Sequence, residues 1–436
     1  MTNKLEALVL KRLRQNKNDI RYSMRMAGLG NPFAGESDSA RLQQRLQKKI
    51  NLSASEAKAV DGEVRRRART KMFRNTLVDV QQQHTQDRIA GETLAIPRER
   101  QDIPASIREK VWGDSLDFVN VAFLQRGAQI ARSVARVADK NGHTCGSGVL
   151  IGEGLFLTSH RVIATARQAR QLYLEFDYEC DLSGNSRKST RFNFDTSLFI
   201  TDPETGLDFT VIGVGEVIDG PETLNAFGIS ALSTASDKHM IGEFINLVQH
   251  PKGRFKEVVL HENRLVNRTG DCLHYAADME PGSPGSPLYN SEWQIIALHH
   301  WGGPWVDGGN KSDPERFEIN EAIRVSAIIA RLKRRLPHLP SAAQNRIANI
   351  VDCQAAVLPS PVQSLSINHH PEKRLTKPAE TKTDSHGATI VTLPIEVSFT
   401  IPSSAIEPDA MTECLREAGI SFNTVADQAV ENSGRK

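Results

Sequence analysis

The spacing of hydrophobic and polar residues changes along the chain, and the first region, residues 1–114, is polar with one thin apolar stripe. The stripe consists of Leu5, Leu8, Leu10 and Leu13. This spacing predicts a helix, and Ser53 followed by Glu56 has the pattern of a capping box at the start of another helix. Because the stripe is thin, we expect these helices to be ordered by a partner or by the next domain.

Residues 115–336 contain short β-like runs separated by Gly, Pro, Asn and Asp. The runs are Val149–Ile151, Leu155–Thr158, Leu172–Phe176, Phe209–Val214, Phe244–Val248, Glu257–Leu260, Leu273–Ala276 and Gln294–His300. Many short strands at close spacing predict a mainly β fold, a sandwich or a barrel. Residues 319–336 follow with apolar positions at helical spacing, which predicts one amphipathic helix closing the β domain.

The remaining residues predict a linker and a small appended segment. Residues 337–387 are rich in Pro, Ser, Lys and Thr, a composition typical of linkers. Residues 388–436 begin with an alternating run up to Ile401, in which Pro394 indicates an edge strand. A short helix is expected near Asp409–Ala418. The strand could pair with a neighbour's sheet or with a sheet of the same chain, and the sequence leaves both open.

Composition excludes several classes of protein. Of 436 residues, 39% are hydrophobic and 24% charged, which excludes wholesale disorder and collagen-like repeats. We find neither an apolar stretch of about 20 residues nor the apolar core of a secretory signal, and we therefore expect a cytoplasmic protein without a membrane partner. The five cysteines are odd in number and have no CxxC spacing, so neither a disulfide framework nor a zinc site is indicated.

Charge is distributed unevenly between the two ends of the chain. Residues 1–110 hold 23 Lys and Arg against 13 Asp and Glu, which leaves 31 basic and 39 acidic residues beyond them. Such a basic region can attract nucleic acid or an acidic partner. It can equally be the solvated face of charged helices. Aromatic residues for base stacking are nearly absent there, and we find no nucleic-acid-binding motif.

Three segments of the β region, taken in order, resemble the trypsin-like serine peptidases, especially the bacterial glutamyl-endopeptidase branch. They are Cys145–Ile163, which contains Thr158-Ser-His-Arg161; Gly206–Gly213; and Glu280–Tyr289, which contains Gly-Ser-Pro-Gly-Ser-Pro. Gln294–Gly303 resembles the strand that lines the specificity pocket of that family. The resemblance covers roughly residues 115–335 and implies a trypsin-like double β-barrel with a C-terminal helix.

Aligned with the family, two of the three catalytic positions are substituted. Arg161 stands at the place of the general-base histidine, Pro284 stands at the place of the nucleophilic serine, and only Asp208 matches. A guanidinium stays protonated and cannot take a proton from a hydroxyl, and proline carries no nucleophile. In place of the family's hydrogen bond between aspartate and imidazole, Arg161 is expected to form a buried ion pair with Asp208.

The oxyanion hole of the family is affected as well. The resemblance implies that it uses the N–H groups of Gly282 and of the residue at position 284, where proline has none. Losing one such donor costs about 3–4 kcal/mol of transition-state stabilisation. The sequence therefore predicts a catalytically inactive peptidase homologue. An active serine endopeptidase remains as an alternative, with His160 as base, Asp208 as its partner and Ser286 as nucleophile after local shifts of the chain.

His299 stands where glutamyl endopeptidases use a histidine to bind an acidic side chain. The resemblance thus implies a residual preference for acidic peptides if the cleft survives; otherwise His299 is a buried histidine of the barrel. No ligand spacing indicates a metal, and no cofactor is implied. We expect a peptide or protein in the remnant cleft, while nucleic acid or an acidic protein at residues 1–110 is the further candidate partner.

Overall fold

The computed structural model describes residues 3–83, 121–152, 154–260, 263–277, 284–307, 315–351, 380–383 and 389–392. The chain divides into two compact units, residues 1–364 and 365–436. In the second unit, strands β14 (Glu380–Thr383) and β15 (Thr389–Thr392) form an antiparallel pair. The expected helix at 409–418 and the alternating run after residue 392 lie outside the described residues.

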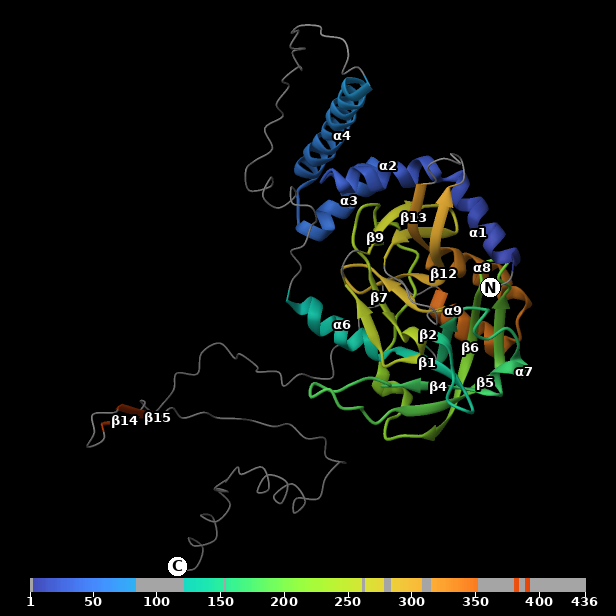
Figure 1. Ribbon diagram of the computed structural model, residues 1–436. Helices are drawn as coiled ribbons and strands as arrows, with labels where there is room; N and C mark the ends of the chain where they lie inside the picture. The colour runs from blue at the N-terminus through green and yellow to red at the C-terminus, as the bar shows by residue number, and fades with distance from the viewer. Residues whose placement is uncertain are drawn as a thin grey trace, which may run out of the picture. The chain divides into compact units, whose positions relative to one another are not determined.

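The first unit contains two β-barrels (Figure 1). The first is closed, in the order β1-β2-β3-β6-β5-β4. Its strands are β1 (Val134–Asp139), β2 (Thr144–Gly152), β3 (Leu155–Thr158), β4 (Leu172–Phe176), β5 (Thr190–Asp202) and β6 (Phe209–Asp219), with the short helix α7 (Ala166–Ala169) between β3 and β4. The mainly β fold predicted from the alternating runs is confirmed.

The second barrel is a seven-stranded antiparallel sheet in the order β8-β7-β11-β12-β13-β10-β9. Its strands are β7 (Asn246–Gln249), β8 (Glu257–Val259), β9 (Arg264–Arg268), β10 (Cys272–Ala276), β11 (Pro287–Tyr289), β12 (Ile295–Asp307) and β13 (Glu315–Arg324). A bridge between Phe244 and Arg264 connects β9 to the chain entering β7, so the sheet curls back on itself. Short 3₁₀ helices occupy 224–227, 236–238 and 251–253 in the connections.

The closing helix is shorter than the sequence predicts. Residues 319–324 belong to strand β13, and α8 (Val325–Arg335) begins only after Arg324. The reason is burial on both faces: Ile319, Glu321, Ala322 and Ile323 are each at most 1% exposed. Ile319 packs against α1 and Ile323 against the core around α8, while Ala322 packs inside the second barrel. A strand covered on both faces loses its alternation, and its apolar positions then imitate a helical period.

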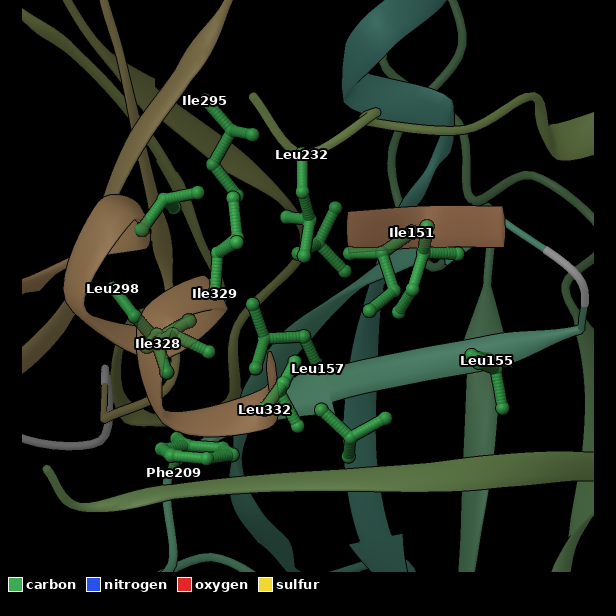
Figure 2. Packing of buried hydrophobic residues seen from close by; sticks show 14 of the residues in the cluster. Ile151, Leu155, Leu157, Phe209, Leu232, Ile295, Leu298, Ile328, Ile329 and Leu332 are labelled. Atoms are coloured by element: carbon green, nitrogen blue, oxygen red, sulfur yellow. The ribbon is translucent and has the colours of Figure 1, made fainter. Parts of the chain in front are cut away.

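The predicted linker starts later than expected, because its first part is helical. After a 3₁₀ turn at 336–338, helix α9 (Ser341–Val351) packs beside α8. Its apolar positions Ile347, Ile350 and Val351 are buried in the core that both barrels share. Figure 2 shows this core, with Leu157 and Phe209 of the first barrel beside Ile328, Ile329 and Leu332 of α8.

In the described part of residues 1–133, five helices precede the first strand. They are α1 (Asn3–Gln15), α2 (Lys17–Gly28), α3 (Ser39–Ile50), α4 (Ala54–Gln83) and α6 (Ala122–Arg132), with a 3₁₀ turn at 32–35. The predicted capping box is confirmed, since the Ser53 amide donates to Glu56 at 2.7 Å and the Glu56 amide donates to the Ser53 hydroxyl at 3.3 Å. None of the helices in the described ranges is both long and apolar enough to cross a bilayer.

Helices α1 to α3 lie along the second barrel (Figure 1). Leu5, Val9 and Leu13, four residues apart on α1, are fully buried against Trp301 and its neighbours. The second barrel thus covers Leu5 and Leu13 of the predicted stripe, while Val9 takes the central position and Leu8 and Leu10 are only partly buried.

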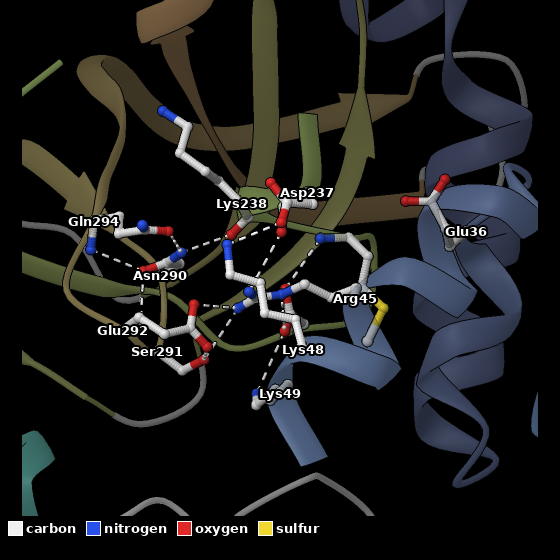
Figure 3. A network of polar contacts seen from close by, with 12 residues as sticks. Glu36, Arg45, Lys48, Lys49, Asp237, Lys238, Asn290, Ser291, Glu292 and Gln294 are labelled. Atoms are coloured by element: carbon white, nitrogen blue, oxygen red, sulfur yellow. Dashed lines mark hydrogen bonds and ion pairs between the residues drawn. The ribbon is translucent and has the colours of Figure 1, made fainter. Parts of the chain in front are cut away.

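Two buried ion pairs attach α3 and the turn before it to the same barrel. The Arg45 side chain is 0% exposed and donates from Nε to both oxygens of Glu243 at 2.9 and 3.0 Å, while its Nη2 lies 2.7 Å from Glu292 (Figure 3). Glu36 accepts two hydrogen bonds from Arg268 at 2.7 and 2.8 Å. Arg45 is thus an N-terminal cation neutralised by carboxylates of the barrel, whereas in the other pair the N-terminal residue is the carboxylate Glu36.

Candidate functional site

Asp208 is the centre of the site, at the start of strand β6. It is fully buried and has a left-handed backbone conformation, with φ at 40°. Its carboxylate accepts from the Ser159 hydroxyl at 2.8 Å, from the Arg161 amide at 3.2 Å and from Arg161 Nε at 3.1 Å. Burial raises the pKa of a carboxyl group, yet here hydrogen bonding to His300 and the charges of His300 and Arg161 hold the pKa of Asp208 below its usual value.

The ion pair expected between Arg161 and Asp208 is present. Arg161 lies in the turn after β3, its side chain is 19% exposed, and Nε faces the buried carboxylate. A second contact, from the Arg161 amide, fixes the turn at the same carboxylate. The guanidinium thus shares Asp208 Oδ2 with the ring of His300.

His160 points elsewhere. Its Nδ1 lies 2.7 Å from the Thr201 hydroxyl, which in turn is 2.7 Å from the hydroxyl of Thr210. Within the described part of the chain, His160 has no hydrogen bond to Asp208 or to Ser286. The structure brings Arg161, not His160, to the aspartate.

Pro284 and Gly285 lie shortly before strand β11, and both contact the first barrel. The Pro284 carbonyl accepts from the Ser147 amide at 3.0 Å, and the Gly285 amide donates to the His299 carbonyl at 2.9 Å. Gly285 has φ at 83°, and a Cβ there would collide with the Ser147 carbonyl and the Thr158 hydroxyl. Only glycine fits this backbone. Gly282 lies outside the described residues.

Ser286 is fully buried, and its hydroxyl has no hydrogen-bond partner among the residues described. Its carbonyl accepts from the His299 amide at 2.8 Å, which places it beside strand β12. A buried, unpartnered hydroxyl is costly and calls for an explanation in function or strain.

His299 is 5% exposed, and its Nδ1 lies 2.8 Å from the Tyr275 hydroxyl. Burial lowers the pKa of His299 to about 3, and the positive charges of Arg161 and His300 act in the same direction. The imidazole is therefore neutral at physiological pH, held as a hydrogen-bonding group rather than a charge.

His300 is the functional residue that the sequence reasoning missed. It is fully buried, and its two ring nitrogens lie 3.2 Å from Asp208 Oδ2 and 2.7 Å from Glu321 Oε1. Burial lowers the pKa of a histidine, but hydrogen bonds to the two carboxylates outweigh it and raise the pKa of His300. A signal was present in the sequence: a histidine pair inside an apolar strand and a glutamate inside the apolar run 319–323.

The network continues from Glu321 to the N-terminal helix. Glu321 is fully buried and accepts from Arg12 Nε at 3.1 and 2.9 Å and from His274 Nε2 at 2.9 Å. His274 Nδ1 faces the Asn267 amide at 3.0 Å. A continuous chain of charged groups thus joins Arg161, on the first barrel, with Arg12 on α1.

Other parts of the described chain offer less chemistry. A cavity of about 470 Å³ lies outside this network, lined by Ala131, Glu179, Cys180, Val248, Arg254, Phe255, Lys256, Glu257 and Val258. No three His, Cys, Asp or Glu side chains in the described ranges are grouped as a metal ion would need.

Comparison with known proteins agrees with this geometry. Residues 146–298 match the family described as trypsin-like peptidase domain. Residues 146–298, which include strands of both barrels, are therefore similar to a trypsin-like peptidase domain.

Two further proteins are similar to parts of the chain. The uncharacterised protein y4fB of Sinorhizobium fredii is 31% identical over 257 residues, and the alignment covers 51% of this chain but only 38% of that protein. The crystal structure of an inactive mutant form of Rv3671c from M. tuberculosis H37Rv is 15% identical, with a TM-score of 0.32. That alignment covers 51% of this chain and 96% of the other.

Removal of Arg161 is expected to destabilise the domain. Arg161→Ala leaves the buried Asp208 carboxylate without its nearest cation, and the free energy of unfolding should fall by about 3 kcal/mol. Thermal and urea unfolding of the two proteins measure the difference. Unchanged melting would mean that the ion pair contributes nothing to the fold.

Proposed function

We propose that this chain is a peptidase homologue that binds a peptide or protein without cleaving it. The observation that carries the proposal is Arg161 on Asp208, at the place where the resemblance to the glutamyl-endopeptidase branch puts the general base. A protonated guanidinium accepts no proton. The histidine that does contact Asp208 is His300, and its other ring nitrogen is bound to Glu321, so it is not directed toward a serine.

Pro284 supports the same proposal from the other side of the site. It supplies neither a nucleophile nor a backbone donor for an oxyanion, and its carbonyl is bonded to Ser147. The alternative is an active endopeptidase with a preference for acidic residues. It needs His160 to give up its contact with Thr201 and to form hydrogen bonds with both Asp208 and Ser286. Both movements would have to occur together.

The third candidate, nucleic-acid binding through residues 1–110, draws less support. Arg12 and Arg45 are bound to buried carboxylates, and Arg65, Arg66 and Arg67 pair with Asp61 or Glu63 on their own helix. A steep dependence of any nucleic-acid binding on salt concentration would favour this candidate.

The test is labelling of the purified protein with a fluorophosphonate probe, together with hydrolysis of Glu-containing reporter peptides. We expect wild type to be silent in both, because among the described residues no serine hydroxyl is hydrogen-bonded to a histidine ring. The double variant Arg161→His, Pro284→Ser restores the family's residues at both positions and serves as the positive arm.

One result would establish the active alternative instead. Labelling of wild type that disappears in Ser286→Ala would identify Ser286 as a nucleophile and end the pseudopeptidase proposal.

A further inference from the structure

The network around Asp208 holds more positive than negative charge. His300 bridges two carboxylates, and carboxylates only accept, so both of its ring nitrogens must carry a proton. His300 is therefore an imidazolium. His274 also contacts Glu321, through Nε2, while its Nδ1 faces the side-chain amide of Asn267, and any charge on this ring adds to the positive side.

The charges within this buried network can then be added up. Arg12, Arg161 and the His300 imidazolium face the two carboxylates of Asp208 and Glu321. The sum is one excess positive charge. Buried charge without a counterion is costly, and the cost is relieved by an anion.

Two guanidiniums of the network are partly exposed, Arg12 at 25% and Arg161 at 19%. Arg12 holds Glu321 through Nε and a terminal nitrogen, so the less engaged of the two is Arg161. Its Nε is bound to Asp208, whereas no hydrogen bond within the described chain reaches its two terminal nitrogens. At 19% exposed, this side chain is open to a ligand, while Asp208, His300 and Glu321 are fully buried. Two parallel N–H groups on a planar cation match the two oxygens of a carboxylate.

A second donor without a partner lies near by. The Ser286 hydroxyl is fully buried and unpartnered in the described ranges. The preceding residue, Gly285, packs against the Ser147 carbonyl, the Thr158 hydroxyl and the Ser159 amide, and Ser159 lies two residues before Arg161. Ser286 thus belongs to the same corner between the barrels as the guanidinium.

We propose that the substituted catalytic position is a carboxylate receptor, in which the Arg161 guanidinium binds a carboxylate of a peptide. This inference rests on the proposed function and gives it a ligand chemistry. Asp208, His300 and Glu321 are positioning residues that hold the guanidinium in place and supply the charge balance. The position that the resemblance assigns to the general base thus binds an anion.

The test compares three pools of fluorescently labelled random octapeptides by fluorescence anisotropy. One pool has a fixed central Glu and an amidated C-terminus, one a central Gln and an amidated C-terminus, and one a central Gln and a free C-terminal carboxylate. We expect one of the two carboxylate pools to bind wild type about 10-fold or more tighter than the uncharged pool, as expected for charge-assisted hydrogen bonds. The preferred pool tells a side-chain carboxylate from a terminal one.

Variants assign the effect to Arg161. In Arg161→Gln the preference between pools should disappear, and in Arg161→Lys it should shrink, because the charge stays while the planar fork is lost. Should Arg161→Gln fail to fold, the double variant Arg161→Gln, Asp208→Asn removes both charges of the pair and takes its place. Arg187→Gln, at a surface arginine paired with Glu179, is the matched control and should keep the preference.

The outcomes separate this inference from the proposed function. Equal binding of all three pools, unaffected by Arg161→Gln, would overturn the carboxylate receptor and leave peptide binding in place. Absence of binding by every pool would overturn both.

Discussion

Replacing Arg45 with alanine is expected to lower the free energy of unfolding by about 3–5 kcal/mol, because it leaves a buried carboxylate without its cation. The Arg45 side chain is completely buried and holds the carboxylates of Glu243 and Glu292, as seen in Figure 3. Without it, Glu243 keeps only the Met240 amide and Lys49, at 3.4 Å, against the cost of its burial.

Urea unfolding monitored by circular dichroism measures this change. The matched control is Arg66→Ala, which breaks an ion pair with Glu63 on the surface of α4, where the Arg66 side chain is 50% exposed. Such pairs contribute about 0–1 kcal/mol. A loss in Arg45→Ala no larger than in the control would show that α3 is not anchored by this arginine.

The second large effect is expected at Glu321. Glu321→Gln keeps the shape of the side chain but removes the charge that faces Arg12 and His300, and we expect a loss of about 3–5 kcal/mol of folding stability. Its pH dependence is diagnostic. Burial opposes the charged form of His300, yet Asp208 and Glu321 raise its pKa, so its contribution is complete below the unfolded value of about 6.5.

That contribution should be lost as the pH rises from about 6.5 through the folded-state pKa of His300. In Glu321→Gln the pKa of His300 is raised less, and the decline of stability above pH 6.5 should be shallower than in wild type. Chemical unfolding at a series of pH values between 6 and 9 compares the two slopes. His143→Gln, at an exposed histidine, should leave the wild-type slope unchanged, and equal slopes in all three proteins would contradict the role of His300.

The sequence was sufficient for the Arg161–Asp208 pair and insufficient for the network behind it. Arg161 and Asp208 lie in two segments whose relative position follows from the family resemblance, so the contact between them could be foreseen. His300, Glu321 and Arg12 come from a strand, another strand and the first helix, and Arg12 is 309 residues from Glu321. Nothing local connects residues so distant, because only the packing of α1 on the second barrel brings them together.

The elements that were misread share one physical cause. Residues 319–324 are buried on both faces. Helix α9 lies near the start of residues 337–387, and most of the Pro, Ser and Lys residues of that segment come after the helix, so the average composition conceals it. In both places the local pattern was overridden by tertiary burial. Where one face is open to solvent, as on α1 or at the start of α4, the spacing predicted the element correctly.

The contact between Arg12 and Glu321 also has a consequence for synthesis of the chain. At about 5–20 residues per second, the ribosome needs roughly 15–60 s between making Arg12 and making the glutamate that receives it. During that interval the apolar side of α1 has no barrel to cover it, since Trp301 and Ile319 are made late as well. The nascent chain therefore exposes a helix with an apolar face and basic residues to chaperones until β13 leaves the ribosome. Chains on ribosomes that are stalled before β13 is made should remain bound to chaperones.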